Sequence, residues 1–202
     1  MNDKIQTWPP RSCDMPEIKD VCAFRTLGHM LNVFFRAGGP KRKKSSALVK
    51  NYIRIVDHLI IEYKYARAAL LKFVNTPNNV LGPLLVATGH LETIISSLKR
   101  AIRFLECIKR DRHIPTIEKN LSVLSSDTKK RVTSLRNAIQ HLDERLIKGE
   151  HGDGEANALL VKSDGIELFN TEIKYTEIAN WIRELDKVSS QLATYTEENV
   201  KN

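Results

Sequence analysis

The sequence has little of what stabilises small secreted proteins or holds structural zinc. Its 202 residues include three cysteines, an odd number, and no two of them have the Cys-x-x-Cys spacing. An odd set without paired spacing predicts neither a disulfide framework nor a zinc knuckle. We therefore expect reduced cysteines, a cytoplasmic protein and no metal site.

Long apolar runs are also missing. The longest stretches, such as residues 81–87, fall far short of the roughly 20 residues that a membrane-spanning helix needs. The N-terminus has no basic segment followed by an apolar core, which a secretion signal requires. The sequence thus predicts neither secretion nor a membrane partner.

Several hydrolase signatures are absent as well. The histidines at 29, 58, 90 and 113 form no pair at a useful metal-ligating spacing. There is no glycine-rich loop that could surround a phosphate and no Gly-x-Ser-x-Gly elbow. These absences argue against zinc hydrolases, P-loop proteins and serine hydrolases, and we expect no cofactor.

Charge is abundant but unevenly placed. The net charge is +8, and residues 36–72 hold 10 basic and 2 acidic residues, including the run Lys41, Arg42, Lys43 and Lys44. Residues 150–202 hold 5 basic and 11 acidic residues, a balance of −6. The basic region fits a nucleic-acid or phosphate-rich partner, and the change of sign predicts a boundary near Gly149.

Apolar periodicity predicts a mainly α-helical fold. We expect an extended leader over residues 1–16, a helical bundle over 17–149, and an acidic β-hairpin with a last helix over 150–202. The bundle helices are expected over 17–37, from residue 45 or 46 to 74, over 84–110 and over 126–148. In the C-terminal part, Asp164-Gly165 between two β-prone runs predicts the hairpin turn, and the last helix is expected from about residue 176.

The expected helix over 84–110 has the clearest pattern. Its apolar residues follow an unbroken three-four spacing, at Leu84, Ala87, Leu91, Ile94, Leu98, Ala101, Leu105 and Ile108. The following helix repeats this spacing at Val132, Leu135, Ile139, Leu142 and Leu146. Two such stripes joined by a loop predict an antiparallel helical hairpin over residues 84–148.

Polar residues on the second of these helices form the one group suited to chemistry. At about 100° per residue, Asn137 and His141 lie opposite the apolar stripe and one turn apart, with Arg136 on the flank. A histidine beside a fixed positive charge can transfer protons next to a phosphate, and an arginine can bind that phosphate by paired hydrogen bonds. We therefore take Arg136, Asn137 and His141 as candidate catalytic residues.

This Arg-x4-His arrangement, with a polar residue directly after the arginine, resembles the signature of the HEPN superfamily (higher eukaryotes and prokaryotes nucleotide-binding). The resemblance covers about residues 80–149. It implies an antiparallel helical bundle and a homodimer in which two copies of the motif helix line one cleft. Many members are metal-independent endoribonucleases, often toxins or defence effectors, so an antitoxin or regulatory partner is also implied.

The resemblance further implies a role for each motif residue. His141 would transfer protons, Arg136 would bind the phosphate and its transition state, and Asn137 would orient the reacting groups. The ribose 2′-hydroxyl of RNA would attack and leave a cyclic phosphate. Other members of the superfamily keep the fold as a binding or dimerisation module.

Other interpretations of the sequence remain open. The polar face could belong to a non-catalytic helical interaction module without enzymatic activity, or simply to a solvated surface. The basic segment 41–72 could bind nucleic acid by itself. Two arginines off the apolar stripe of 84–110 could border the same cleft. The candidate nucleic-acid contacts are therefore Lys41, Arg42, Lys43, Lys44, Arg100 and Arg103.

Overall fold

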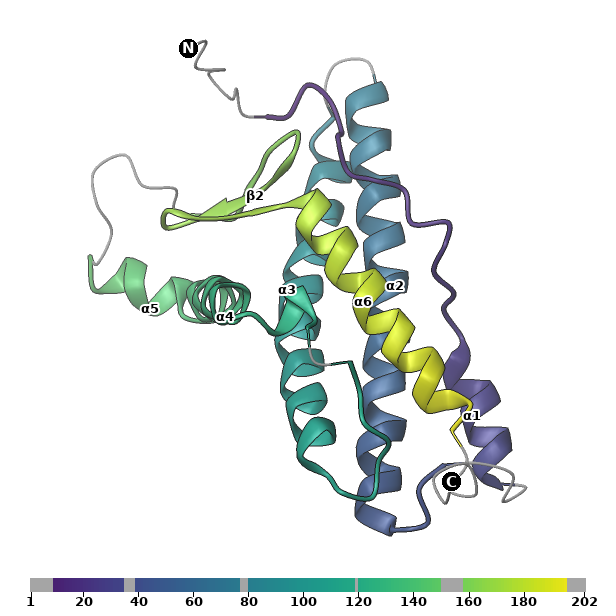
Figure 1. Ribbon diagram of the computed structural model, residues 1–202. Helices are drawn as coiled ribbons and strands as arrows, with labels where there is room; N and C mark the ends of the chain where they lie inside the picture. The colour runs from purple at the N-terminus through teal and green to yellow at the C-terminus, as the bar shows by residue number, and fades with distance from the viewer. Residues whose placement is uncertain (1–8, 35–38, 77–79, 119, 150–157, 196–202) are drawn as a thin grey trace. The chain divides into compact units, whose positions relative to one another are not determined.

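The structure, a computed structural model, describes residues 9–34, 39–76, 80–118, 120–149 and 158–195 (Figure 1). The helices are α1 (Arg25–Phe34), α2 (Lys43–Asn75), α3 (Gly82–Arg110), α4 (Ser126–Gln140), α5 (Leu142–Ile147) and α6 (Tyr175–Ala193), and Ser122–Leu124 form a 3₁₀ turn. The strands β1 (Leu160–Val161), β2 (Gly165–Leu168) and β3 (Thr171–Lys174) form one antiparallel sheet. The predicted mainly helical class with a small sheet is confirmed. In the described ranges, no helix has both the length and the apolar character to cross a membrane.

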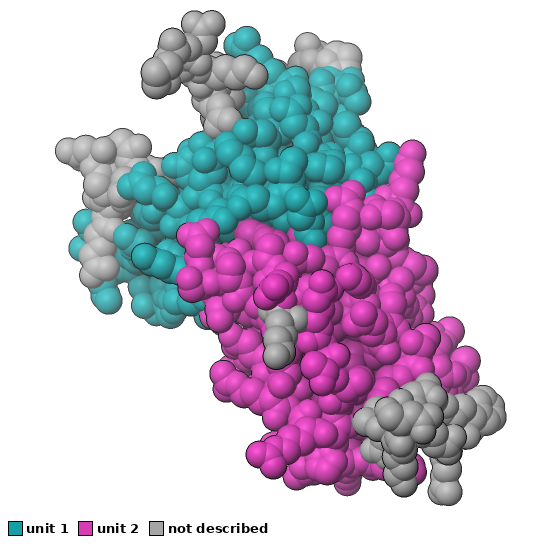
Figure 2. Space-filling model, viewed as in Figure 1, with its two compact units in different colours: residues 1–18, 62–96, 130–180 teal, residues 19–61, 97–129, 181–202 magenta. Residues whose placement is uncertain are grey.

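The chain divides into two compact units, coloured separately in Figure 2. Unit 1 contains residues 1–18, 62–96 and 130–180, and unit 2 contains residues 19–61, 97–129 and 181–202. The long helices α2, α3 and α6 contribute residues to both units. Each unit is therefore assembled from segments that are distant in the sequence.

Helices α2 and α3 pair in an antiparallel manner. In unit 1, Nδ1 of His90 on α3 lies 2.7 Å from Oε2 of Glu62 on α2, and its ring packs against Tyr65 with centroids 5.5 Å apart. In unit 2, the hydroxyl of Ser45 near the start of α2 donates to Asp111, directly after α3, at 2.7 Å. Early residues of α2 thus meet late residues of α3, as an antiparallel pair requires.

The apolar stripe predicted on the third helix is confirmed. None of its eight side chains is more than 4% exposed. Helix α6 also buries an apolar stripe, with exposures of 1% or less at Ile178, Ile182, Leu185, Val188 and Leu192. Apolar residues at three-four spacing bury one continuous face of a helix, so this pattern located the core.

Helix α1 departs from the prediction in both extent and orientation. A helix over 17–37 was expected to bury its apolar face, but α1 begins at Arg25, and residues 35–37 lie outside the described residues. Two of its leucines are exposed to solvent, Leu27 by 65% and Leu31 by 49%, whereas His29 is 1% exposed. Phe24, directly before the helix, is 76% exposed and has a φ of 77°. Periodicity identifies an apolar face but cannot say whether that face is covered.

Polar contacts hold α1 in place within unit 2. Oδ2 of Asp57 on α2 accepts hydrogen bonds from the Thr26 backbone N–H at 2.8 Å and from the Thr26 hydroxyl at 2.5 Å. The guanidinium of Arg25 pairs with the carboxylate of Asp186 on α6. The Asp57 carboxylate therefore satisfies backbone donors at the helix N-terminus, which normally need such an acceptor.

The sheet contains the predicted hairpin and one strand more. Strands β1 and β2 pair around Asp164-Gly165, with Val161 opposite Ile166. Strand β3 was not predicted, and it pairs with β2 through a turn at Phe169 and Asn170, whose φ values are 47° and 60°. Two successive left-handed residues are typical of a type I′ hairpin turn, which glycine and asparagine favour. The turn was not predicted because phenylalanine, at position 169, is not typical of such a turn.

The helix expected over 126–148 is divided. Helix α4 ends at Gln140, and α5 follows directly after His141, whose φ and ψ are −111° and 21°. In unit 1, Figure 1 shows α4 nearly along its axis while α3 runs in the plane of the picture, so the two helices cross steeply. The expected antiparallel hairpin between them is therefore not seen. The predicted end of the segment is confirmed, since Gly149 adopts a left-handed φ of 66°.

Candidate functional site

The candidate catalytic residues lie at the C-terminal end of α4. The helix begins after Ser125, whose hydroxyl accepts the Thr128 backbone N–H at 3.1 Å as an N-terminal cap. Farther along, Val132 and Leu135 have no exposed surface. Because these side chains fix the inward face of α4, residues on its opposite face project into solvent.

The structure places Arg136, Asn137 and His141 within about one turn. Asn137 and His141 are exposed and Arg136 is half-buried. Nη1 of Arg136 donates to Oδ1 of Asn137 at 3.3 Å. The backbone N–H of His141 still donates to the Asn137 carbonyl at 3.0 Å, which keeps His141 in the last turn although α4 ends there.

Glu144 is a neighbour of His141 that the sequence interpretation missed. Its Oε2 lies 3.3 Å from Nδ1 of His141, and the two side chains are 60% and 53% exposed. A carboxylate beside Nδ1 favours the proton on that nitrogen and leaves the other ring nitrogen to accept one. The spacing of three residues on a helix is a signal that could have identified this pair.

The short helix α5, which carries Glu144, is held against the sheet. The guanidinium carbon of Arg145 lies 3.8 Å from the ring centroid of Phe169, in the β2–β3 turn. Such a cation–π contact stabilises by about 0.5–1 kcal/mol at an exposed position. The left-handed turn at Phe169 thus has a consequence for the site, because it presents the ring to α5.

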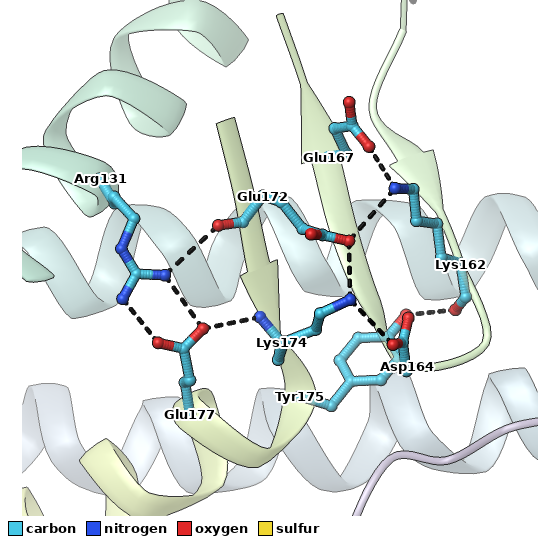
Figure 3. A network of polar contacts seen from close by, with 8 residues as sticks. All are labelled: Arg131, Lys162, Asp164, Glu167, Glu172, Lys174, Tyr175 and Glu177. Atoms are coloured by element: carbon cyan, nitrogen blue, oxygen red, sulfur yellow. Dashed lines mark hydrogen bonds and ion pairs between the residues drawn. The ribbon is translucent and has the colours of Figure 1, made fainter. Parts of the chain in front are cut away.

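A network of charged side chains connects α4 to the sheet and α6 in unit 1 (Figure 3). Both guanidinium nitrogens of Arg131 donate to the carboxylate of Glu177, at 2.6 and 3.0 Å. The same carboxylate accepts the backbone N–H of Lys174 at 3.1 Å. The hydrogen bonds from Arg131 lower the pKa of Glu177. This bidentate pair orients α4, whose far end carries the candidate site.

The second part of the network neutralises acidic side chains of the sheet. Glu172 accepts hydrogen bonds from the ammonium groups of Lys162 and Lys174, at 3.2 and 2.9 Å. Burial alone would raise the pKa of Glu172, but these hydrogen bonds outweigh it and lower that pKa. Asp164 accepts from Lys174 at 2.8 Å, and Glu167 pairs with Lys162. Three of the eleven acidic residues of 150–202 are therefore paired within the sheet.

The predicted nucleic-acid contacts divide into two groups. All six are exposed, but only Arg42 and Lys44 line a hollow in unit 2. This hollow encloses about 420 Å³. We call it the basic hollow, and it is lined by Arg42, Lys44, Leu48, Cys107, Arg110, Asp111, Arg112 and His113. Lys41, Lys43, Arg100 and Arg103 are not part of its lining.

Positive charge prevails in the basic hollow. Its single carboxylate, Asp111, accepts the backbone N–H of His113 at 2.9 Å and the hydroxyl of Ser45 at 2.7 Å. The bond from His113 is the main cause of a lowered pKa at Asp111, and the nearby charge of Arg42 adds to it. Four Lys and Arg side chains thus face one carboxylate that is already bound. Arg110 and Arg112 escaped the sequence interpretation because they border the hollow only once α2 and α3 meet.

Neither a metal centre nor a relative indicates what these sites do. Across the described part of the chain, no three or more His, Cys, Asp and Glu side chains come together as a metal site would require. No protein family, curated protein or solved structure matches the sequence. The functional argument therefore rests on the side chains themselves.

Proposed function

We propose that this chain is a HEPN-like, metal-independent endoribonuclease and that Arg136, Asn137 and His141 form its active face. The observation that supports it is the accessible His141 ring, oriented by Glu144 within one turn of Arg136 and Asn137. An oriented imidazole beside a guanidinium suits proton transfer at a phosphodiester.

The chemistry follows from the position of the groups. With Nδ1–H directed at Glu144, the other ring nitrogen of His141 takes the proton from the ribose 2′-hydroxyl. That oxygen attacks the neighbouring phosphorus, and the bond to the 5′-oxygen breaks. Arg136 binds the phosphate oxygens, on which negative charge grows during attack, and Asn137 positions the guanidinium through its side-chain oxygen.

The leaving 5′-oxygen needs a proton, which a homodimer would supply. In the proposed dimer, two copies of the α4 face line one cleft, and His141 of the partner subunit donates that proton. The products are a 2′,3′-cyclic phosphate and a free 5′-hydroxyl. One His141 accepts a proton and His141 of the partner subunit donates one. Loss of either proton transfer is expected to slow cleavage strongly.

The direct test is incubation of the purified chain with RNA in excess chelator. We expect cleavage products that end in a cyclic phosphate, and a loss of about 100-fold or more in His141→Ala and Arg136→Ala. His58→Ala is the matched control, because His58 is an exposed histidine on α2 in unit 2, and it should cleave normally. Cleavage by His141→Ala at the wild-type rate would refute the catalytic assignment.

A specific observation favours a second candidate, a non-catalytic dimerisation module. The apolar stripe of α1 lies in solvent, at Phe24, Leu27, Met30 and Leu31. Apolar surfaces of this kind commonly mark contact sites between proteins. In this case the purified chain would be a dimer without ribonuclease activity, formed by α1 pairing with α1 of a second copy.

Light scattering separates the two candidates. For the dimerisation module, replacing Leu27 and Leu31 together by Asp should convert the dimer to a monomer. Leu85→Asp is the control, since Leu85 is 70% exposed and lies in unit 1. If the double variant stays dimeric, α1 is not the dimer contact.

A further inference from the structure

The basic hollow plays no part in the proposed cleavage. None of its lining residues belongs to the Arg136–His141 face, and all of them lie in unit 2. It forms where the start of α2 meets the end of α3, and the bond between Ser45 and Asp111 fixes that junction. Half of its lining residues belong to these two helices, and the others directly precede α2 or directly follow α3.

Its electrostatics call for an anionic ligand. Arg42, Lys44, Arg110 and Arg112 surround a concave space, where like charges raise one another's energy. The carboxylate of Asp111 offsets one of these four positive charges, so positive charge remains in excess. A concave surface of one sign concentrates counter-ions of the other, so an anion would be drawn into it.

The chemistry of the lining selects the kind of anion. Three arginines present planar groups of N–H donors, which match phosphate oxygens bidentately, and the lysine adds a point charge. Leu48 provides an apolar wall that could contact a ribose or base. A volume of about 420 Å³ lies within the range of small-molecule sites, about 300–1,000 Å³.

We propose that the basic hollow binds the terminal phosphate of a nucleotide, either a free nucleotide or the end of an RNA strand. A terminal phosphate carries a charge of about −1.5 to −2 near neutral pH, whereas each internal phosphodiester carries about −1. Cations that converge from several sides suit the more highly charged group. This site goes beyond the proposed function, because binding there requires none of the residues proposed for cleavage.

Binding measured by calorimetry on the full chain tests the proposal. The probes are adenosine 5′-monophosphate against adenosine, and a short 5′-phosphorylated RNA against the same RNA with a 5′-hydroxyl. We expect at least one phosphorylated probe to bind at least about tenfold more tightly than its unphosphorylated partner, as charge-assisted hydrogen bonds imply. Tight binding of the mononucleotide identifies a free nucleotide as ligand, and tight binding of the phosphorylated RNA alone identifies an RNA end.

Matched variants locate the site. Arg112→Ala and Lys44→Ala should each weaken phosphate binding about tenfold. Arg54→Ala, an exposed arginine of α2 outside the hollow, should change it less than twofold. His141→Ala should bind normally, so failure of the cleavage proposal is distinguishable from failure of this one. Equal losses in Arg112→Ala and Arg54→Ala, or no preference for the phosphorylated probe in either pair, would overturn the proposal.

Discussion

The Nδ1 atom of His141 lies 3.3 Å from Oε2 of Glu144, three residues along the chain and across the break between α4 and α5. The break therefore does not separate the two side chains. Because Arg145 anchors α5 on Phe169, Glu144 sits on a fixed element rather than on a loose end. The pair resembles the carboxylate and histidine that many enzymes use to orient an imidazole.

Replacing Glu144 by Gln should lower RNA cleavage by about tenfold without changing the fold, since an amide orients the ring less strongly than a carboxylate. The measurement is the single-turnover cleavage rate. Asp143→Asn is the control, because it removes the same charge from an exposed neighbour. If both variants lose activity equally, overall charge and not ring orientation explains the effect.

Because of the ion pair between Arg131 and Glu177, the free energy of unfolding should decrease at acidic pH. The pKa of Glu177 is lowered in the folded chain, so its carboxylate stabilises the fold above about pH 4.5, the ordinary value. That contribution disappears as the pH falls through the lowered value. Glu177→Gln should therefore cost about 1 kcal/mol in the free energy of unfolding at pH 7 and nothing in strong acid.

Urea unfolding at pH 7 and pH 3 measures this difference. Arg131→Met should show the same loss at pH 7, and the double variant should lose little more than either single variant. Additive losses would mean that the two side chains stabilise the chain independently.

The buried His29 should give a second pH dependence near neutrality. Among the described residues no hydrogen bond of normal geometry reaches either of its ring nitrogens. Burial lowers the pKa of His29, and the nearby Ala193 carbonyl only partly opposes this effect. As the pH falls below about 6.5, the unfolded chain therefore takes up a proton more readily than the folded chain, so stability falls until the pH passes the lowered pKa of the folded chain. His29→Leu should remove this fall between pH 7 and pH 5, and His58→Leu should keep it.

Replacement by alanine should have opposite effects on stability at two glycines, Gly165 and Gly89. A Cβ built on Gly165 would lie 2.5 Å from the backbone oxygen of Ile173 on the neighbouring strand, so Gly165→Ala should displace β2 and cost roughly 1–3 kcal/mol. Gly89 lies within α3 with no atom within 4 Å of such a Cβ, so Gly89→Ala should stabilise by about 0.5–1 kcal/mol. Thermal unfolding of the two variants should thus shift in opposite directions.

Local patterns predicted part of the core. The stripe predicted on the second hairpin helix is buried at Val132 and Leu135, but Leu146 at its end is 37% exposed. The stripe from Leu84 to Ile108 is buried as expected, because three-four spacing is a property of one helix. Leu27 and Leu31 of α1 follow similar spacing but lie in solvent. Only the tertiary contacts of Thr26 and Arg25 decide which face of α1 turns inward, and no sequence period encodes them.

The candidate sites also differ in whether the sequence of one helix is enough to predict them. The outward position of Asn137 and His141 could be predicted, because it follows from the stripe on their own helix. The basic hollow could not, because it requires Ser45 and Asp111 to meet across 66 residues of sequence. The strand β3 was missed because Phe169 occupies a turn position that glycine or asparagine usually takes.

The way α1 is attached has a consequence for how the chain opens. Hydrogen bonds and an ion pair hold it, and the side chains of Leu27, Met30 and Leu31 are already exposed to water. Detaching α1 would therefore uncover little new apolar surface, and sensitivity to denaturant scales with newly uncovered surface. Amide hydrogens of α1 should exchange through a local opening whose rate hardly changes with urea, well before the helices that form the core come apart.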